Sequence, residues 1–244
     1  MRIKQEIVLG IGGWKLLRAL GIQPEVCHMN EGHAAFLVLE RAHSFMNDNG
    51  ISFDAALAVT RAGNLFTTHT AVAAGFDHFN PSLMWQFFGD YATIALGIEF
   101  NNLITLGRVN PFDTSESFNM AYLAIRGSGA VNGVSRLHGD VSRNLFSILF
   151  PRQPIHEVPI GYVTNGVHMP SWDSVFADKV WTEACGKNRW KGELESLEKD
   201  INKIKDETLW QMRNDCRNEL VNFTRERFER ESEIALQSQE FIDA

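Results

Sequence analysis

The stretch PEVCHMNEGHAAFLVLERAHSFMN, residues 24–47, decides the fold of this chain. Residues 24–29 form a short apolar run that predicts a buried strand, and Asn30 follows it directly as a predicted helix N-cap. Residues 31–47 predict a helix that is apolar nearly all round, with Glu31 in the first turn, where the helix dipole favours a carboxylate. A strand that leads at once into a buried helix is the repeating unit of an α/β domain.

The same alternation continues to about residue 172. Further strands are expected at 65–68, 131–134 and 159–164, and further helices at 55–61, from Asn80-Pro81 onward, at 115–126 and at 135–149. The character then changes: residues 186–208 are rich in Lys and Glu. Apolar residues at spacings of three and four follow and predict a long amphipathic helix: Leu209, Met212, Cys216, Leu220 and Phe223.

Composition excludes several classes of protein. The chain has 244 residues, 44% of them hydrophobic, and a net charge of −7, which argues against a nucleic-acid-binding surface. Its three cysteines suggest neither a disulfide framework nor a zinc site. Without a signal peptide or an apolar run of membrane-spanning length, the sequence predicts a cytoplasmic chain that makes no membrane contact.

The glycines of Gly10-Ile11-Gly12-Gly13 resemble part of a dinucleotide fingerprint, but Lys15 stands where the third glycine is needed. We expect these glycines to permit a tight entry into a helix over 14–20 that Gly21 closes. His28, Glu31 and His33 are not expected to bind a metal ion either, because their spacing matches no helical zinc motif. Histidines satisfied in the core or in a cleft are the commoner outcome, and no metal site is expected.

Polar residues follow the predicted strands at the point where each strand ends. Asn30, Glu31 and His33 follow the first strand, His69 the second and Asn165 the last. In open α/β sheets ligands bind at this edge, beside strand ends and helix N-termini. Asn, His and Glu side chains offer the donors and acceptors that sugar hydroxyls require. The residues alone therefore predict a cleft for a polar ligand.

Five blocks of the sequence resemble those of α-glucan phosphorylases of the shorter bacterial and archaeal form. They occur in the family's order: RIKQEIVLGIGGWKLLRALG (2–21), HMNEGHAAFLVLER (28–41), FTTHTAVAAGFDHF (66–79), NGVSRLHGDVSR (132–143) and GYVTNGVHMPSW (161–172). The resemblance implies an α/β fold, a Rossmann-like portion of the N-terminal domain of a glycosyltransferase-B fold, plus connecting helices. It assigns 1–172 to the later part of that domain, with the sugar side of the cleft. It assigns 173–244 to a helical segment leading towards an absent C-terminal cofactor domain.

The resemblance also implies roles for single residues. His69 matches the histidine that contacts the glucosyl unit, and Asn165 matches the asparagine that hydrogen-bonds its hydroxymethyl end. Val134 matches a residue lining that pocket. Glu31 and His33 match an acidic–histidine pair at the far side of the pocket, where many members carry Asp instead of Glu. Asn30 is expected to support this pair as a cap.

Two departures from the family pattern concern the loop after His69 and the cofactor. Alanines at 71 and 73 replace two prolines, so a more mobile loop is expected. The family uses pyridoxal phosphate, but neither its lysine motif nor the glycine-rich phosphate loop occurs in this chain. Lys179 and Lys187 lie in polar, loop-like surroundings and are poor Schiff-base candidates.

The implied activity is phosphorolysis of terminal α-1,4-glucosyl units to glucose 1-phosphate. Its partners would be an α-1,4-glucan or maltodextrin and orthophosphate, and a homodimer is left open. We expect the chain to be inactive in isolation, because the half of the site that stabilises charge is missing. Two alternatives remain: a stand-alone oligosaccharide-binding module without catalysis, and an interaction protein that uses the amphipathic helix.

Overall fold

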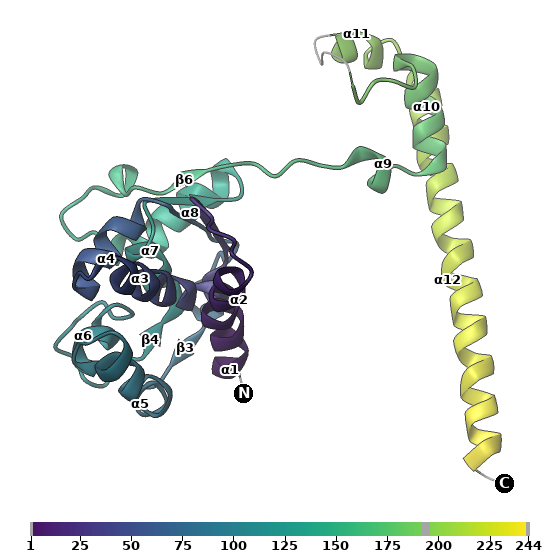
Figure 1. The fold of residues 1–244 in the computed structure, drawn as a ribbon. Coiled ribbons are helices and arrows are strands. Elements are labelled where there is room, and N and C mark those ends of the chain that lie inside the picture. The colour runs from purple at the N-terminus through teal and green to yellow at the C-terminus, as the bar shows by residue number, and fades with distance from the viewer. Residues whose placement is uncertain (1, 192–195, 243–244) are drawn as a thin grey trace. The chain divides into compact units, whose positions relative to one another are not determined.

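The computed structural model describes residues 2–191 and 196–242, with side chains of the last helix as far as Ile234. The chain forms two compact units, Met1–Asn165 and Gly166–Ala244. The first is a mixed α/β unit and the second is helical (Figure 1). The expected α/β class is therefore confirmed for the first unit.

A parallel sheet organises the first unit. Its four strands are in the order β1-β2-β5-β6, and each neighbouring pair is parallel. The strands are β1 (Cys27–Asn30), β2 (Asn64–Thr67), β5 (Ala130–Gly133) and β6 (Gly161–Tyr162). A separate antiparallel pair joins β3 (His78–Phe79) to β4 (Phe118–Asn119). Because the four strands are parallel, their carboxyl ends meet at one edge of the sheet.

Helices and helical turns connect the strands. The first unit contains α1 (Arg2–Ile7), α2 (Gly13–Ala19), α3 (Phe36–Asn49), α4 (Phe53–Arg61), α5 (Pro81–Asp90), α6 (Phe100–Thr105), α7 (Met120–Arg126) and α8 (Arg136–Phe146). It also has π-helical segments η1 (Val8–Gly12) and η4 (Tyr91–Ala95), and 3₁₀ turns η2 (Gly32–Ala34), η3 (Ala73–Gly75), η5 (Ser147–Leu149) and η6 (Ile155–Glu157). The predicted cap at Asn80 is confirmed, since its side chain accepts from the N–H of Leu83 at 2.8 Å.

The core lies around Phe36 at the start of α3. This side chain is fully buried, and its ring lies 4.5 Å from that of Phe88 and 6.3 Å from that of Phe118 (centroid to centroid). Burial alternates along β1: Cys27 and Met29 are buried, whereas the residues between and after them are exposed. The predicted strand is therefore buried on one face only, the one that faces the core.

The start of α3 differs from the expectation. The chain makes the 3₁₀ turn η2 first, and α3 begins only at Phe36, not at residue 31. Asn30 is the last residue of β1 and caps no helix, so its predicted capping role was wrong. A helix cannot begin at residue 31, because Glu31 has a φ of 76° and a ψ of 166°; beside it the chain packs closely on the start of α7, where a Cβ at Gly32 would lie 3.2 Å from the backbone nitrogen of Ala121. At its other end, α3 is closed by Gly50 in the left-handed conformation, which the sequence Asn49-Gly50 is typical of.

The glycines at 10–13 lie inside a continuous helical stretch, α1–η1–α2, and not at its entry. Gly10 is the point where this stretch crosses α3, since a Cβ there would lie 2.6 Å from the backbone nitrogen of Leu37. The predicted tight entry into a helix was therefore wrong. Close packing of two helices explains why residue 10 is a glycine. The helix predicted from residue 115 also starts later, at Met120, where Asn119 caps it.

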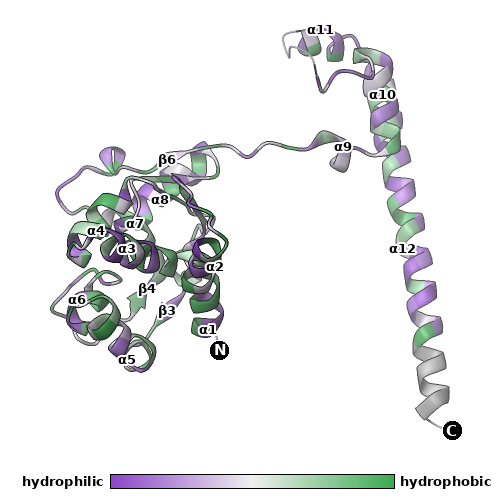
Figure 2. Ribbon diagram, in the orientation of Figure 1, coloured by the Kyte–Doolittle hydropathy of each residue, from purple (hydrophilic) through white to green (hydrophobic). Residues whose placement is uncertain are grey.

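The second unit contains α9 (Met169–Trp172), α10 (Val175–Cys185), α11 (Leu197–Ile201) and α12 (Asp206–Ile242). The predicted long helix is confirmed as α12, and α10 lies alongside its first part, with Ser174 Oγ 3.2 Å from Cys216 Sγ (Figure 1). Hydrophilic and hydrophobic residues alternate along α12 (Figure 2). None of the described helices combines the length and apolar character that crossing a membrane requires.

Candidate functional site

The carboxyl edge of the sheet gathers three of the predicted site residues. β1 ends at Asn30, and the next residue, Glu31, still donates its backbone N–H to the carbonyl of Thr67 at 2.9 Å. β2 ends at Thr67, two residues before His69. Parallel pairing of β1 with β2 therefore places Asn30, Glu31 and His69 together. We call these three residues the edge cluster.

Direct hydrogen bonds hold the edge cluster together. Nε2 of His69 lies 2.7 Å from Oδ1 of Asn30, and because a carbonyl oxygen only accepts, the imidazole donates there. The backbone N–H of His69 donates to Oε1 of Glu31 at 3.0 Å. The hydroxyl of Thr70 donates to Oε2 of the same carboxylate. In a neutral imidazole this leaves Nδ1 of the exposed His69 ring as a free acceptor.

The backbone of Glu31 is unusual. Its φ of 76° and ψ of 166° fall in a region that only glycine enters readily, and it is the one non-glycine residue with positive φ among those described. Such a conformation costs on the order of 1–3 kcal/mol and persists only where surrounding contacts enforce it. Here the strand hydrogen bond to Thr67 enforces it on one side and the packing of Gly32 on the other.

Val134 lies just past the end of β5, the strand next to β2. Its backbone N–H donates to Nδ1 of His138 at 3.3 Å, and Ser135 caps α8 by accepting the N–H of His138 at 3.1 Å. The carbonyl of Gly133 accepts the N–H of Val163 at 2.9 Å, which ties the same turn to the end of β6. The turn that carries Val134 is thus fixed from α8 and from β6.

His33 and Asn165 are not part of these hydrogen bonds. His33 is half-buried in η2, and Asn165 is exposed in the last residues of the first unit. Among the described residues neither side chain has a hydrogen-bond partner. The structure therefore brings Asn30, Glu31 and His69 into contact, places Val134 on the adjacent strand end, and leaves His33 and Asn165 outside the network.

A second polar row, missed by sequence reasoning, crosses the face of the sheet opposite to the one that carries Met29 and Phe66. Nε2 of His28 lies 2.7 Å from the hydroxyl oxygen of Thr67, which in turn donates to Oδ1 of Asn132 at 3.0 Å. Because the Thr67 proton is used on Asn132, His28 donates to Thr67. The alternation of side chains along β1, with His28 and Asn30 two residues apart, was a usable signal for this row.

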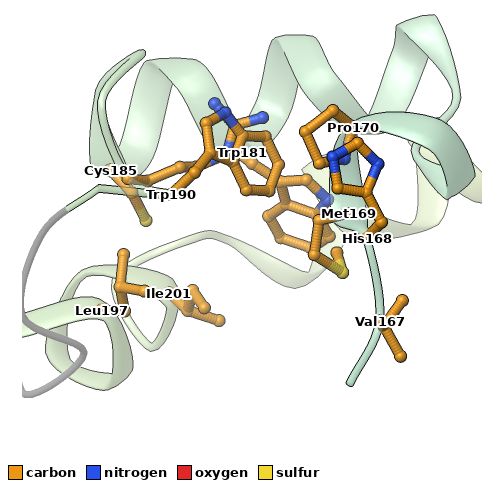
Figure 3. Close-up of a pocket in the computed structure, with 10 residues that line it drawn as sticks. Val167, His168, Met169, Pro170, Trp181, Cys185, Trp190, Leu197 and Ile201 are labelled. Atoms are coloured by element: carbon orange, nitrogen blue, oxygen red, sulfur yellow. The ribbon is translucent and has the colours of Figure 1, made fainter. Parts of the chain in front are cut away.

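The helical unit contains a cavity of about 590 Å³ that holds none of the predicted site residues (Figure 3). Its walls are mostly apolar, with His168 and Arg189 as the charged or titratable members: Val167, His168, Met169, Pro170, Trp181, Cys185, Arg189, Trp190, Leu197 and Ile201. A sugar needs many donors and acceptors, and this cavity offers few. The polar chemistry and the apolar cavity therefore lie in different units.

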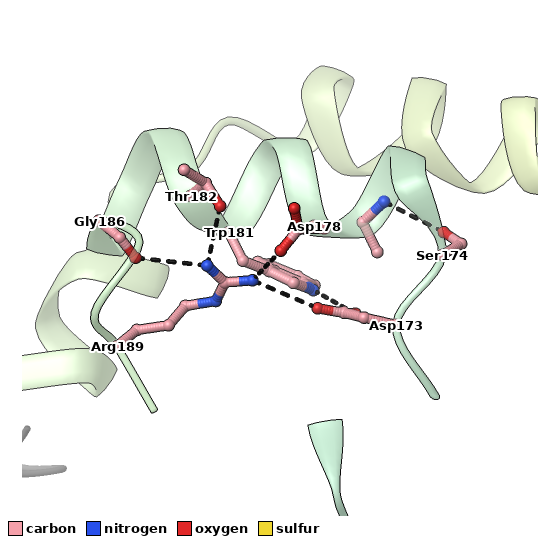
Figure 4. A network of polar contacts seen from close by, with 8 residues as sticks. Asp173, Ser174, Asp178, Trp181, Thr182, Gly186 and Arg189 are labelled. Carbon is pink, nitrogen blue, oxygen red and sulfur yellow. Dashed lines mark hydrogen bonds and ion pairs between the residues drawn. The ribbon is translucent and has the colours of Figure 1, made fainter. Parts of the chain in front are cut away.

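Arg189 is committed to its own unit and not to a ligand. Its side chain is 5% exposed and donates to Thr182 Oγ1 at 2.8 Å, to Asp178 and, at 3.5 Å, to Asp173 (Figure 4). Asp173 also accepts from the indole N–H of Trp181 at 3.2 Å. The guanidinium lies 3.7 Å from the ring centre of Trp190. Buried charges need partners of this kind, so the network stabilises the wall of the cavity.

Comparison with known proteins identifies the family. The sequence profile described as "Carbohydrate phosphorylase" matches residues 22–244. The chain is 38% identical over 236 residues to the glycogen phosphorylase of Mycobacterium tuberculosis, covering 93% of this chain and 27% of that protein. It is 37% identical over 234 residues to the maltodextrin phosphorylase of Thermococcus litoralis, covering 95% and 27%.

The chain belongs to the carbohydrate phosphorylase family. It spans about 27% of the length of these two relatives, and 30% of the glycogen phosphorylase of Aquifex aeolicus, to which it is 34% identical over 212 residues. Within this carbohydrate phosphorylase chain, four of the five blocks that carried the resemblance lie in the first unit, and the fifth (161–172) runs from its last residues into the second unit. The recognition of a phosphorylase from those blocks is confirmed.

The lysines of this phosphorylase chain do not suit a Schiff base with pyridoxal phosphate. Such a lysine is activated by removal from water, yet every lysine that the structure describes is exposed. Lys179 and Lys187, the two weighed from the sequence, are among them. As for metals, the described residues contain no group of three His, Cys, Asp or Glu side chains placed to hold an ion.

Proposed function

We propose that this chain carries the sugar-side half of the active site of an α-glucan phosphorylase of glycosyltransferase-B architecture. Residues 1–172 would form the later part of the N-terminal catalytic domain, and 173–244 would connect it to the cofactor domain. The relatives named glycogen phosphorylase and maltodextrin phosphorylase support glucan phosphorolysis as the activity of the complete enzyme. Its products would be glucose 1-phosphate and a shortened glucan, from α-1,4-glucan and orthophosphate.

The observation that carries this proposal is the edge cluster at the carboxyl end of a parallel sheet. His69 is held there with Nε2 donating to Asn30, so Nδ1 remains to accept a sugar hydroxyl. The location is the one where open α/β sheets bind ligands. We assign His69 to the terminal glucosyl unit, Val134 to the apolar wall of its pocket and Asn165 to the hydroxymethyl end. His33 is assigned to the far side of the pocket.

Catalysis would require groups that the described residues do not supply. Transfer of a glucosyl unit to phosphate needs cations to bind orthophosphate and a proton donor for the departing sugar oxygen. At the edge cluster the ionisable side chains are Glu31, already engaged by two donors, and His69. This half of the site therefore binds and orients the glucosyl unit, a contribution to catalysis through positioning.

Titration of the chain with maltotriose, followed by NMR, tests the proposal. Shifts are expected at residues 30–33, 69–70 and 133–134, and His69→Ala should weaken binding at least tenfold. Val59→Ala, at an exposed position on α4 outside the cluster, is the matched control. Saturating maltotriose that moves no signal at the carboxyl edge would overturn the assignment. Release of glucose 1-phosphate by the chain alone would overturn its restriction to the sugar side.

A second candidate function is a module that binds a protein partner without catalysis. It is favoured by large apolar side chains exposed on the helical unit: Trp172 (80% exposed), Val175 (77%), Trp210 (63%) and Phe228 (66%). Exposed apolar surface of this kind usually marks an interface. Light scattering over a range of concentrations separates the two candidates when combined with the maltotriose titration. Association without sugar binding would favour the interaction module.

A further inference from the structure

Asn30, the last residue of β1, and Glu31, the residue after it, both hydrogen-bond to His69. Asn30 accepts from the imidazole Nε2 at 2.7 Å, and Glu31 accepts from the backbone N–H of the same histidine at 3.0 Å. The second oxygen of Glu31 is taken by the hydroxyl of Thr70, the next residue along. The ring and the backbone of His69 are therefore fixed by two consecutive residues at the end of β1.

The carboxylate of Glu31 reaches this position because of its strained backbone. A residue continuing β1 with ordinary extended torsions would point its side chain to the face opposite that of Asn30. The φ of 76° breaks that alternation at Glu31. Gly32, the next residue, does not have a positive φ. The strained torsion is that of Glu31, the residue that carries the carboxylate.

We infer that Glu31 is a positioning residue, whose carboxylate orients His69 for the sugar. Each of its oxygens already accepts a hydrogen bond from residue 69 or 70, which favours an action of the carboxylate on the glucosyl unit through His69. The sugar-binding role of His69 in this inference rests on the proposed function. The hydrogen bonds of Glu31 to residues 69 and 70 do not depend on that proposal. The resemblance implied a place for Glu31 in the pocket itself. The inference gives Glu31 an indirect role, through His69, that can be tested separately.

Glu31→Gly separates positioning from folding. Glycine adopts the observed torsions without strain, so the variant should unfold at the same or a higher denaturant concentration than the wild type. Without the carboxylate, the amide of His69 should exchange with solvent at least tenfold faster. The tautomer signals of the His69 ring should shift from protonated Nε2 towards a mixture. Affinity for maltotriose should fall at least tenfold.

Two further variants complete the experiment. Glu31→Gln keeps one oxygen acceptor and should preserve most of the His69 amide protection. Glu99→Gln, at an exposed glutamate whose side chain makes no capping hydrogen bond at the start of α6, is the matched control and should change nothing. Unchanged His69 exchange and ring signals in Glu31→Gly would overturn the inference whether or not sugar binds. Failure of the wild type to bind maltotriose would count against the proposed function alone.

Discussion

Nδ1 of His138 accepts the backbone N–H of Val134 at 3.3 Å, across the turn that joins β5 to α8. An imidazole nitrogen that accepts carries no proton, so the neutral ring must carry its proton on Nε2. That Nε2 is buried and has no hydrogen-bond partner among the described residues. Leaving a buried donor unpaired costs about 1–3 kcal/mol, which the fixed turn at Val134 must offset.

The effect of replacing His138 on the turn should depend on where the new side chain places its hydrogen-bond acceptor. His138→Asn keeps an acceptor at the distance of Nδ1, so amide exchange at Val134 should remain within about threefold of wild type. His138→Gln moves the acceptor to the distance of Nε2, and exchange should rise about tenfold, the equivalent of a hydrogen bond worth about 1.4 kcal/mol. Equal exchange in the two variants would show that the imidazole acts through packing alone.

Gly10 and Gly13 form a matched pair on one helical stretch. A Cβ at Gly10 would lie 2.6 Å from the backbone nitrogen of Leu37 and 2.9 Å from Phe36, whereas a Cβ at Gly13 would meet nothing within 4 Å. Backbone atoms cannot turn away as side chains do. We expect Gly10→Ala to lower the free energy of unfolding by about 1–3 kcal/mol or more. Gly13→Ala should raise it by about 0.5–1 kcal/mol.

Chemical denaturation of both variants measures this difference. If Gly10→Ala were as stable as Gly13→Ala, the close crossing of α1–η1–α2 over α3 would be refuted. The same pair explains an error of sequence reading. A glycine run looks like a loop whether it permits a turn or a close helix crossing, and only the partner helix distinguishes these two uses.

Much of the fold was accessible to local signals. The cap at Asn80 and the stop at Gly50 depend on residues within one turn of the helix end, and both were predictable. The polar residues that follow β1 and β2 were also predictable as neighbours, because the carboxyl ends of parallel strands lie at one edge of the sheet. Asn30 and His69 were therefore placed correctly at that edge, although the capping role of Asn30 was not.

The remainder depends on contacts between distant segments. The torsions of Glu31 have no sequence signature, since a glutamate followed by glycine normally places positive φ on the glycine. They occur beside a tight contact between distant segments, since a Cβ at Gly32 would lie 3.2 Å from the backbone nitrogen of Ala121. The late start of α3 follows from these non-helical torsions of Glu31 and not from the helix propensity of residues 31–35. The network around Arg189 joins residues up to 16 positions apart, beyond the reach of helical periodicity.

Arg189 should hold the helical unit together independently of the first unit. Arg189→Met leaves Asp173, whose side chain is 8% exposed, buried without its cation. Breaking a buried pair in this way costs about 3–5 kcal/mol. Hydrogen exchange should therefore accelerate throughout α10, while the amides of α3 keep their protection. Asp178→Asn, at a side chain 54% exposed, should have a much smaller effect. Equal effects of these two changes would argue against Asp173 as the partner that matters.

Glu6 should make the first unit lose stability as the pH rises. Its carboxyl is 1% exposed, and burial, with the nearby charge of Asp77, raises its pKa from 4.5 to about 8. Arg2 opposes this rise, with Nε 2.8 Å from Glu6 Oε1, but it also donates twice to Asp77. The folded state therefore holds a proton that the unfolded state releases above pH 4.5.

The stabilisation from neutral Glu6 is thus complete below pH 4.5 and disappears as the pH rises to about 8. Glu6→Gln mimics the neutral carboxyl at every pH and keeps its shape. Relative to this variant, the wild type should lose about 1.4 kcal/mol of unfolding free energy per pH unit within that window, or ~3 kcal/mol between about pH 5.5 and 8. Using the difference between the two proteins cancels the titration of the other carboxylates, which favours the folded state as the pH rises. A difference that stays constant over the window would mean that Glu6 is ionised in the folded chain and paired with Arg2, despite the nearby charge of Asp77.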